Sequence, residues 1–168
     1  AVKGGGGPVL VLPYEEVGRV AAGHPVISGH HGAVYDTDWN PFNPNMVATG
    51  SDDGTVKIWG VPDGGLTENL TEPLADLHGH GKPVTFVQFN PTANNVLASA
   101  GKDHTCKIWD VEKQEAKLEL SGWEGMVQDL QWDRTGAQVL VSSKDKQFRV
   151  FDARSKTATA TIAAHEGA

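Results

Sequence analysis

Short stretches of alternating hydrophobic and polar residues recur along the chain, and each is bounded by turn-forming residues. In the clearest example, Val34–Trp39 alternates until Asn40-Pro41 interrupts the pattern. Such runs between Gly, Pro, Asn and Asp are typical of β-strands. The strands predicted around this example lie at 34–39, 46–49, 56–59 and 74–77. No segment keeps a helical period over three turns, so the pattern predicts an all-β chain.

The strand pattern repeats. The stretch 29–60 aligns without a gap with 79–110, and 122–152 aligns with both after the loss of one residue. Extra length between the first two units lies in 61–73, which we interpret as a Pro- and Gly-rich loop. Four strands in about 40–45 residues are typical of a propeller blade. The sequence therefore predicts an all-β, partial β-propeller.

The repeat boundaries predict about three and a half four-stranded blades. We expect the tail strands of one blade in 1–27, at 9–12 and 25–27, and the start of a further blade in 164–168. The predicted complete blades are 28–78, 79–121 and a degenerate 122–163. A small four-bladed ring is the alternative, but the repeats resemble consecutive members of a larger ring. Open sheet edges then predict that the chain by itself associates with other copies, aggregates or needs the missing part of the ring.

Composition narrows the function classes. One cysteine among 168 residues excludes an internal disulfide framework and fits a reducing compartment. A net charge of −7 argues against a general nucleic-acid binder, and no apolar run is long enough to span a membrane. The chain shows no signal peptide and begins Ala-Val-Lys, so we interpret it as a piece of a longer protein.

No catalytic or metal-binding motif emerges, and no cofactor is predicted. The close pairs around His30 and His80 could hold a metal with a nearby carboxylate, but a structural role within the blades is favoured. Cys106 falls inside a predicted strand, as expected for a core thiol. Asp36 and Asp38 lie on one face of a strand, either as an acid pair or, as we favour, as hydrogen-bonded or solvated residues.

The units 29–60 and 79–110 run from Gly-His to Trp-Gly and from Gly-His to Trp-Asp, and they resemble WD repeats. The resemblance implies a hydrogen-bonded network in each blade. Its members would be His30, Thr49, Asp53 and Trp59, then His80, Ser99, Asp103 and Trp109. In the third unit Trp123, Val141 and Phe151 replace the His, hydroxyl and Trp, and only Asp145 remains. We expect apolar packing to hold that blade.

Further runs carry a narrower resemblance. PVLVLPYEEVGRV, GGLTENLTEPLADLHGHG, SSKDKQFRVFDARS and AHEGA together resemble the N-terminal half of the coronin propeller. This resemblance implies a seven-bladed ring that binds filamentous actin in the cytoplasm, at the actin cytoskeleton, without catalysis. It also implies a coiled coil for oligomerisation and contact with the actin-nucleating Arp complex, both outside this chain.

Basic residues supply the candidate binding surface. Lys102, Lys144 and Lys146 fall in the same turn of successive blades, and Lys82 precedes the first strand of its blade, so all four should share one end of the propeller. Arg149 and Arg154 are expected to add to an outer edge. Solvated turn charge is the alternative interpretation. A second functional hypothesis is a generic WD-repeat adaptor that binds a peptide over the channel.

Overall fold

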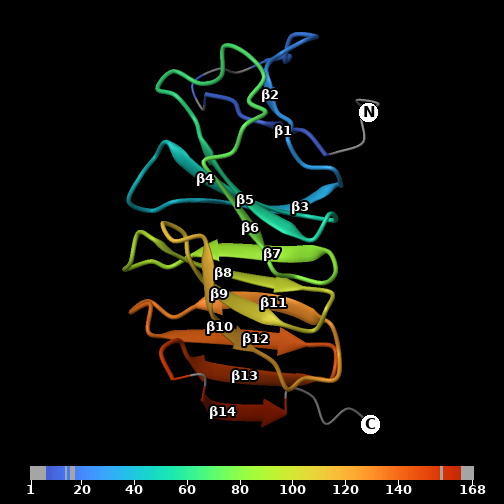
Figure 1. The fold of residues 1–168 in the computed structure, drawn as a ribbon, viewed down its shortest axis with the longest axis vertical. Helices are drawn as coiled ribbons and strands as arrows, with labels where there is room; N and C mark the ends of the chain where they lie inside the picture. The colour runs from blue at the N-terminus through green and yellow to red at the C-terminus, as the bar shows by residue number, and fades with distance from the viewer. Residues whose placement is uncertain (1–6, 14, 16–17, 156, 164–168) are drawn as a thin grey trace.

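The computed structural model describes residues 7–155 apart from 14, 16 and 17, and then 157–163. All regular elements in these ranges are β-strands, which form three four-stranded antiparallel sheets and one two-stranded sheet. The sheets are stacked one after another along the molecule (Figure 1). The prediction of an all-β partial propeller is therefore confirmed. The expected start of a further blade at 164–168 lies outside the described residues.

Each four-stranded sheet is a meander in which consecutive strands pair. The first sheet contains β3 (Val34–Trp39), β4 (Met46–Ser51), β5 (Thr55–Gly60) and β6 (Ala75–His78). The second contains β7 (Val84–Phe89), β8 (Val96–Gly101), β9 (Cys106–Asp110) and β10 (Glu115–Leu120). The third contains β11 (Val127–Trp132), β12 (Gln138–Ser143), β13 (Gln147–Asp152) and β14 (Ala158–Ala163). The two-stranded sheet pairs β1 (Val9–Leu10) with β2 (Val26–Ile27).

The first strand of each four-stranded sheet carries a β-bulge near its start. The register of β3 with β4 shifts between Val34 and Asp36, and the same shift recurs in β7 and β11. A bulge leaves one residue unpaired and re-aims its side chain. The bulged residues are Tyr35, Thr85 and Gln128.

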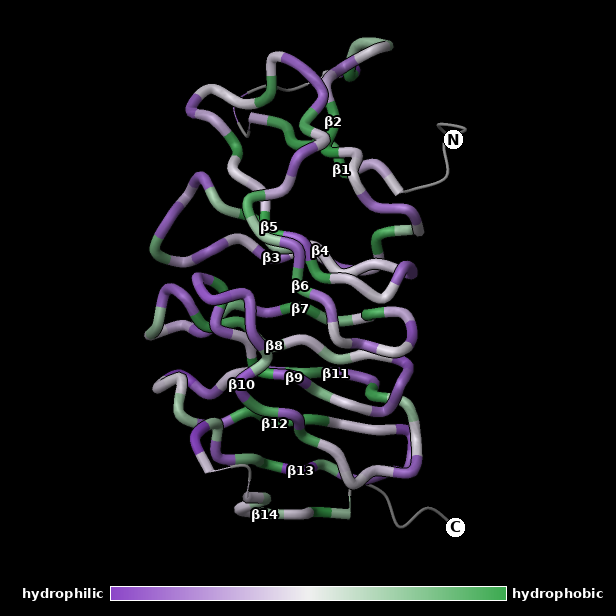
Figure 2. Tube along the Cα trace, viewed as in Figure 1, coloured by the Kyte–Doolittle hydropathy of each residue, from purple (hydrophilic) through white to green (hydrophobic). Residues whose placement is uncertain are grey.

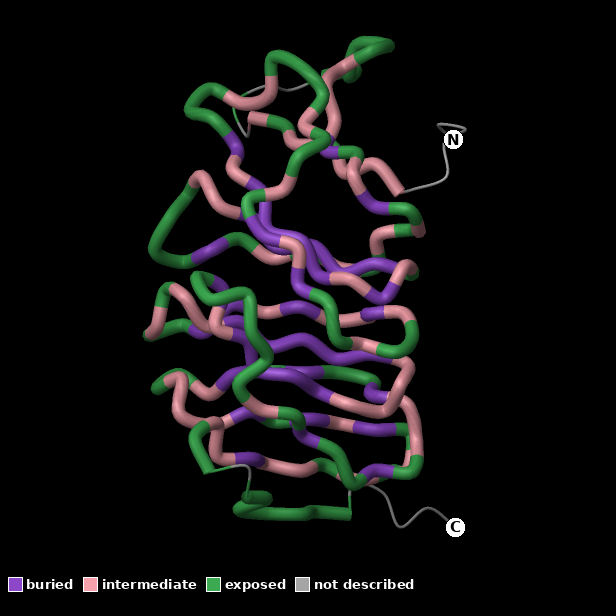
Figure 3. The backbone as a smooth tube through the Cα atoms, in the orientation of Figure 1, coloured by how far each residue is buried: buried purple, intermediate pink, exposed green. Residues whose placement is uncertain are grey.

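Hydrophobic side chains pack between the sheets. One cluster joins the first two blades and includes Ile58, Val87 and Trp109, and a second joins the last two blades and includes Ile108, Leu130 and Phe151. Hydrophobic and buried positions run along the inner strands in Figures 2 and 3. Because both faces of the middle sheet are covered, its strands β8 and β9 read as nearly continuous buried runs.

The first and third four-stranded sheets, at the two ends of the three blades, both expose apolar side chains. Trp39 at the end of β3 is 46% exposed, whereas its equivalents Phe89 and Trp132, which face a preceding blade, are 3% and 9% exposed. At the other end, Phe148 and Ile162 are exposed on the third sheet. The same strand pattern is thus buried or exposed according to whether another blade covers it.

Candidate functional site: blade networks and a basic rim

Four side chains of the first blade form a continuous chain of hydrogen bonds. Trp59 Nε1 donates to Thr49 Oγ1 at 2.9 Å, and Thr49 Oγ1 lies 2.6 Å from His30 Nε2. His30 Nδ1 lies 2.9 Å from a carboxylate oxygen of Asp53. One tautomer satisfies the whole chain: the hydroxyl donates to Nε2, and Nδ1–H donates to the carboxylate. Strands β4 and β5 and the turn between them thereby hold the loop before β3.

The second blade repeats this geometry. Trp109 Nε1 donates to Ser99 Oγ at 2.7 Å, Ser99 Oγ lies 2.7 Å from His80 Nε2, and His80 Nδ1 lies 2.9 Å from Asp103. The same carboxylate accepts the backbone N–H of Gly81 at 2.9 Å. The structure therefore brings together both sets of four residues that the resemblance to WD repeats implied.

Burial and hydrogen bonding set the charge states of these networks. Burial lowers the pKa of His30 and of His80, which favours the neutral imidazole. For Asp53 and Asp103 burial acts to raise the pKa, but hydrogen bonds and the neighbouring histidine outweigh it and hold both pKa values below their usual range. Each network therefore pairs a neutral imidazole with an ionised carboxylate.

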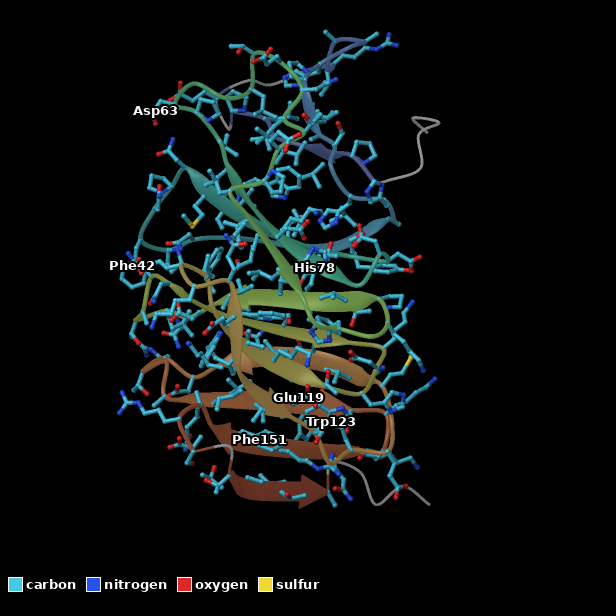
Figure 4. The ribbon with its side chains drawn as sticks, viewed as in Figure 1. Phe42, Asp63, His78, Glu119, Trp123 and Phe151 are labelled. Carbon is cyan, nitrogen blue, oxygen red and sulfur yellow. The ribbon has the colours of Figure 1, made fainter. Side chains whose placement is uncertain are left out.

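The third blade is held differently. Trp123 and Phe151 pack edge to face with ring centres 5.7 Å apart, and Figure 4 shows their side chains together on the third sheet. Trp123 Nε1 is buried without a hydrogen-bond partner. Apolar packing was expected here. In addition, Asp145 receives hydrogen bonds from Ser143 and Arg149, a polar set that the sequence analysis did not foresee.

The register explains why Arg149 takes this role. Lys57 and Lys107 occupy its position in the other blades, and each is buried and pairs with a carboxylate on the fourth strand, Asp76 or Glu119. In the third blade the residue opposite Arg149 on β14 is Thr161, which carries no charge. Arg149 Nη2 instead lies 2.9 Å from Asp145. Although burial acts to raise it, these hydrogen bonds lower the pKa of Asp145 to about 2.

The turns between the second and third strands lie beside the loops that precede the first strands. Lys102 N donates to Pro83 O at 2.8 Å, and Lys144 N donates to Met126 O at 2.9 Å. This pairing places Lys82, Lys102, Lys144 and Lys146 at one end of the blades, a surface that we call the basic rim. Among the described residues, none of the four forms an ion pair with a carboxylate; the ammonium of Lys102 lies 4.6 Å from the centre of the Tyr35 ring.

At the same end, the first blade carries an acidic residue in place of a rim lysine. Asp52 occupies the turn position of Lys102 in the second blade and Lys144 in the third. Tyr35 connects Asp52 to the basic rim, because its hydroxyl donates to Asp52 at 2.8 Å and accepts a hydrogen bond from Lys102 at 3.3 Å. Sequence reasoning missed the role of Tyr35 beside the basic rim. Tyr35 aligns with Thr85 and Gln128 in the sequence, but the bulge that these three residues share is visible only once the strand pairing is known.

The WD-repeat model (WD domain, G-beta repeat) matches residues 23–60, 71–110 and 114–152. The chain belongs to the WD-repeat family. Mouse Coronin-2B is 51% identical over 75 residues, which are 45% of this chain and 16% of the mouse protein. Human Coronin-2B is 49% identical over 75 residues, which are again 45% of this chain and 16% of the human protein. The chain therefore matches only a small part of these relatives.

A solved structure shows the same fold. The crystal structure of the WD40 domain from Toxoplasma gondii coronin matches with a TM-score of 0.81 and 31% sequence identity. The match covers 85% of this WD-repeat chain and 37% of that chain. Together with the Coronin-2B matches, it confirms the resemblance to coronins that the sequence motifs indicated.

Asp36 and Asp38 join two WD blades. Their carboxylates accept the backbone N–H groups of Val87 at 2.9 Å and of Phe89 at 2.7 Å. Burial raises the pKa of both carboxyl groups. The two aspartates are therefore hydrogen-bonded residues, which is the interpretation that the sequence analysis favoured. Gln88 makes the equivalent contact between the second and third blades, because its side-chain oxygen accepts a hydrogen bond from Trp132 N at 2.9 Å.

The other candidate sites resolve as follows. Cys106 is fully buried in β9, and burial raises the pKa of its thiol. Within the described ranges, no group of three or more His, Cys, Asp or Glu side chains is placed to hold a metal ion. Arg154 is exposed, and its backbone N–H donates to Asp152 at 2.8 Å. No described helix is long and apolar enough to cross a membrane.

Proposed function

We propose that this chain is part of a coronin-type propeller that binds filamentous actin through the basic rim, without catalysis. The observation that carries the proposal is the set of four rim lysines, none of which pairs with a carboxylate in the described part of a chain whose net charge is −7. Unpaired lysines at one end of an acidic protein favour an acidic partner surface there. Actin filaments offer such a surface.

The blades supply rigidity to this surface. Each rim lysine lies on a loop or turn fixed by backbone hydrogen bonds, and in the second blade also by the His80–Asp103 contact. A preorganised set of charges loses little conformational entropy on binding. Exposed charges act mainly through steering and are screened by salt. Binding through the rim is therefore expected to weaken as ionic strength rises.

The proposal extends to the whole protein in three respects. Oligomerisation through a coiled coil and contact with the Arp complex would both involve segments outside these blades. A location in the cytoplasm, at the actin cytoskeleton, follows from the same function. Arg154, exposed just after β13, is a candidate for a secondary contact, whereas the side chain of Arg149, which pairs with Asp145, is only 12% exposed.

Co-sedimentation with filamentous actin over a salt series tests the proposal. The double variant Lys102→Glu/Lys144→Glu should bind about tenfold more weakly at low salt, because both substitutions turn attraction into repulsion. Lys113→Glu/Lys117→Glu is the matched control, since these lysines carry the same charge on the outer side of the second blade and pair with Asp110 and Glu115.

Equal loss of binding in both double variants would reduce the proposal to net charge alone. Salt-independent binding, or binding of the rim variant at the level of the unmodified chain, would exclude the rim as the contact. In that case the peptide-binding adaptor would become the better hypothesis for this WD-repeat segment.

A further inference from the structure

The connection between β5 and β6 is much longer than its equivalent in the second blade. It occupies 61–74, whereas 111–114 suffices between β9 and β10. This is the Pro- and Gly-rich stretch that the sequence analysis interpreted as a loop. Figure 1 shows that it runs up to β1 and β2, at the end of the molecule far from β14.

Backbone hydrogen bonds join this connection to β2. Leu70 N donates to Val26 O, and Ser28 N donates to Leu70 O, both at 2.9 Å. These two bonds form a parallel bridge between Ile27 and Leu70, whereas all named strands of the described chain pair antiparallel. The side chain of Asn69 accepts a further bond from Val26 N at 3.1 Å. The connection thus continues the β1–β2 sheet on its β2 side.

Apolar side chains of the connection complete the contact. Leu66 and Leu70 pack against a cluster that includes Ile27 of β2 and Trp59 of the first blade. The backbone also approaches closely, since a Cβ at Gly29 would lie 2.5 Å from Thr71 O. Gly29 precedes the network histidine, and a side chain at this glycine would clash with both the connection and the ring of Trp59.

We propose that residues 61–73 are a strap that docks the β1–β2 hairpin onto the first blade. The β1–β2 sheet lies in the stretch that the sequence analysis assigned to the tail strands of a preceding blade. The strap supplies a third hydrogen-bonded segment and two leucines that bridge the hairpin to Trp59. The hairpin and the first blade therefore behave as one unit, held together by a segment that the other two blades lack.

Hydrogen exchange of the whole chain, measured by mass spectrometry, tests the strap. Leu70→Pro removes the N–H that donates to Val26 O, and Asn69→Ala removes the side-chain acceptor for Val26 N while leaving the backbone intact. We expect about tenfold faster exchange at 26–28 in Leu70→Pro and a smaller increase in Asn69→Ala, with exchange in the second and third blades unchanged.

Glu68→Ala is the matched control, because Glu68 is an exposed residue of the same connection and has no hydrogen bond or ion pair. It should exchange like the unmodified chain at every position. Unchanged exchange at 26–28 in both Leu70→Pro and Asn69→Ala would overturn the strap. An equal rise throughout all blades in both variants would also overturn it, because the connection would then support the fold as a whole.

Discussion

The first two blades and the third share one backbone plan but are held by different interactions. In the first two, a buried tryptophan, a hydroxyl, a histidine and an aspartate form a continuous chain of hydrogen bonds. In the third, an aromatic pair occupies the equivalent positions, and the aspartate forms an ion pair with an arginine. The four-stranded meander and the bulge are nevertheless the same. Blade topology therefore does not depend on the network.

The difference shows how one substitution propagates through a blade. Once the histidine is absent, Asp145 has no imidazole to accept from, and once the fourth strand offers Thr161, Arg149 has no carboxylate opposite it. The two groups left without their usual partners then bind each other. A buried charge is costly unless it is paired, so these replacements are physically linked.

The largest expected effect comes from removing the indole of a complete network. Trp109→Ala should lower the free energy of unfolding by about 3–5 kcal/mol, because it leaves a cavity and also takes the donor from Ser99. Phe151→Ala, the equivalent change in the third blade, leaves a cavity but no unpaired hydroxyl and should cost less. Urea unfolding measures both, and an equal cost would contradict the contrast between the blades.

A smaller loss is expected from the hydroxyl alone. Ser99→Ala leaves both Trp109 Nε1 and His80 Nε2 without their partner inside the protein and should cost about 1–3 kcal/mol. Ser142, on β12, is the control, since its side chain has no hydrogen bond. Ser142→Ala should change the urea midpoint very little. Equal midpoints for the two variants would show that the buried chain contributes nothing to stability.

Acidification should weaken the first two blades. Because burial lowers the pKa of His30 and His80, the unfolded chain binds protons more readily below the usual histidine pKa of about 6.5. The free energy of unfolding should therefore fall as the pH decreases from 7.5 to 5.5. Burial raises the pKa of Asp36 and Asp38, so protonation of these carboxyl groups would act in the opposite direction, and the histidine variants isolate the histidine contribution.

The control for the pH dependence is His24→Gln/His31→Gln, since neither histidine belongs to a blade network. Unfolding of this variant should keep the pH dependence of the unmodified chain. His30→Gln/His80→Gln should lose most of it. Identical pH profiles for the two double variants would contradict the assignment to the networks.

The smallest expected effect concerns one turn position. Gly54, His104 and Lys146 occupy equivalent positions and all have left-handed backbone angles, with φ of 80°, 63° and 63°. Gly54→Ala should cost about 1 kcal/mol, whereas His104→Gly should raise the free energy of unfolding by about 0.5–1 kcal/mol. Thermal unfolding distinguishes these signs. A stabilising Gly54→Ala would contradict the comparison.

Local pattern was sufficient to predict the strands, whereas the network members came from the resemblance to WD repeats. The alternation in 34–39 matches β3, and His80, Ser99, Asp103 and Trp109, which the resemblance implied, form a chain of contacts within hydrogen-bond distance. Strand register follows from side-chain alternation, so it could be predicted locally. The role of Arg149 could not be found in this way, because it depends on which residue stands opposite on the fourth strand.

The sequence by itself determined the all-β class, the repeat, the order of the strands and the positions of the rim lysines, because periodicity and turn residues act over short distances along the chain. Only the tertiary structure decided that Tyr35 links Asp52 to Lys102, that Asp36 and Asp38 join neighbouring blades, and that 61–73 pairs with β2. Each of these contacts joins segments far apart in sequence, so it depends on how sheets stack and not on any local pattern.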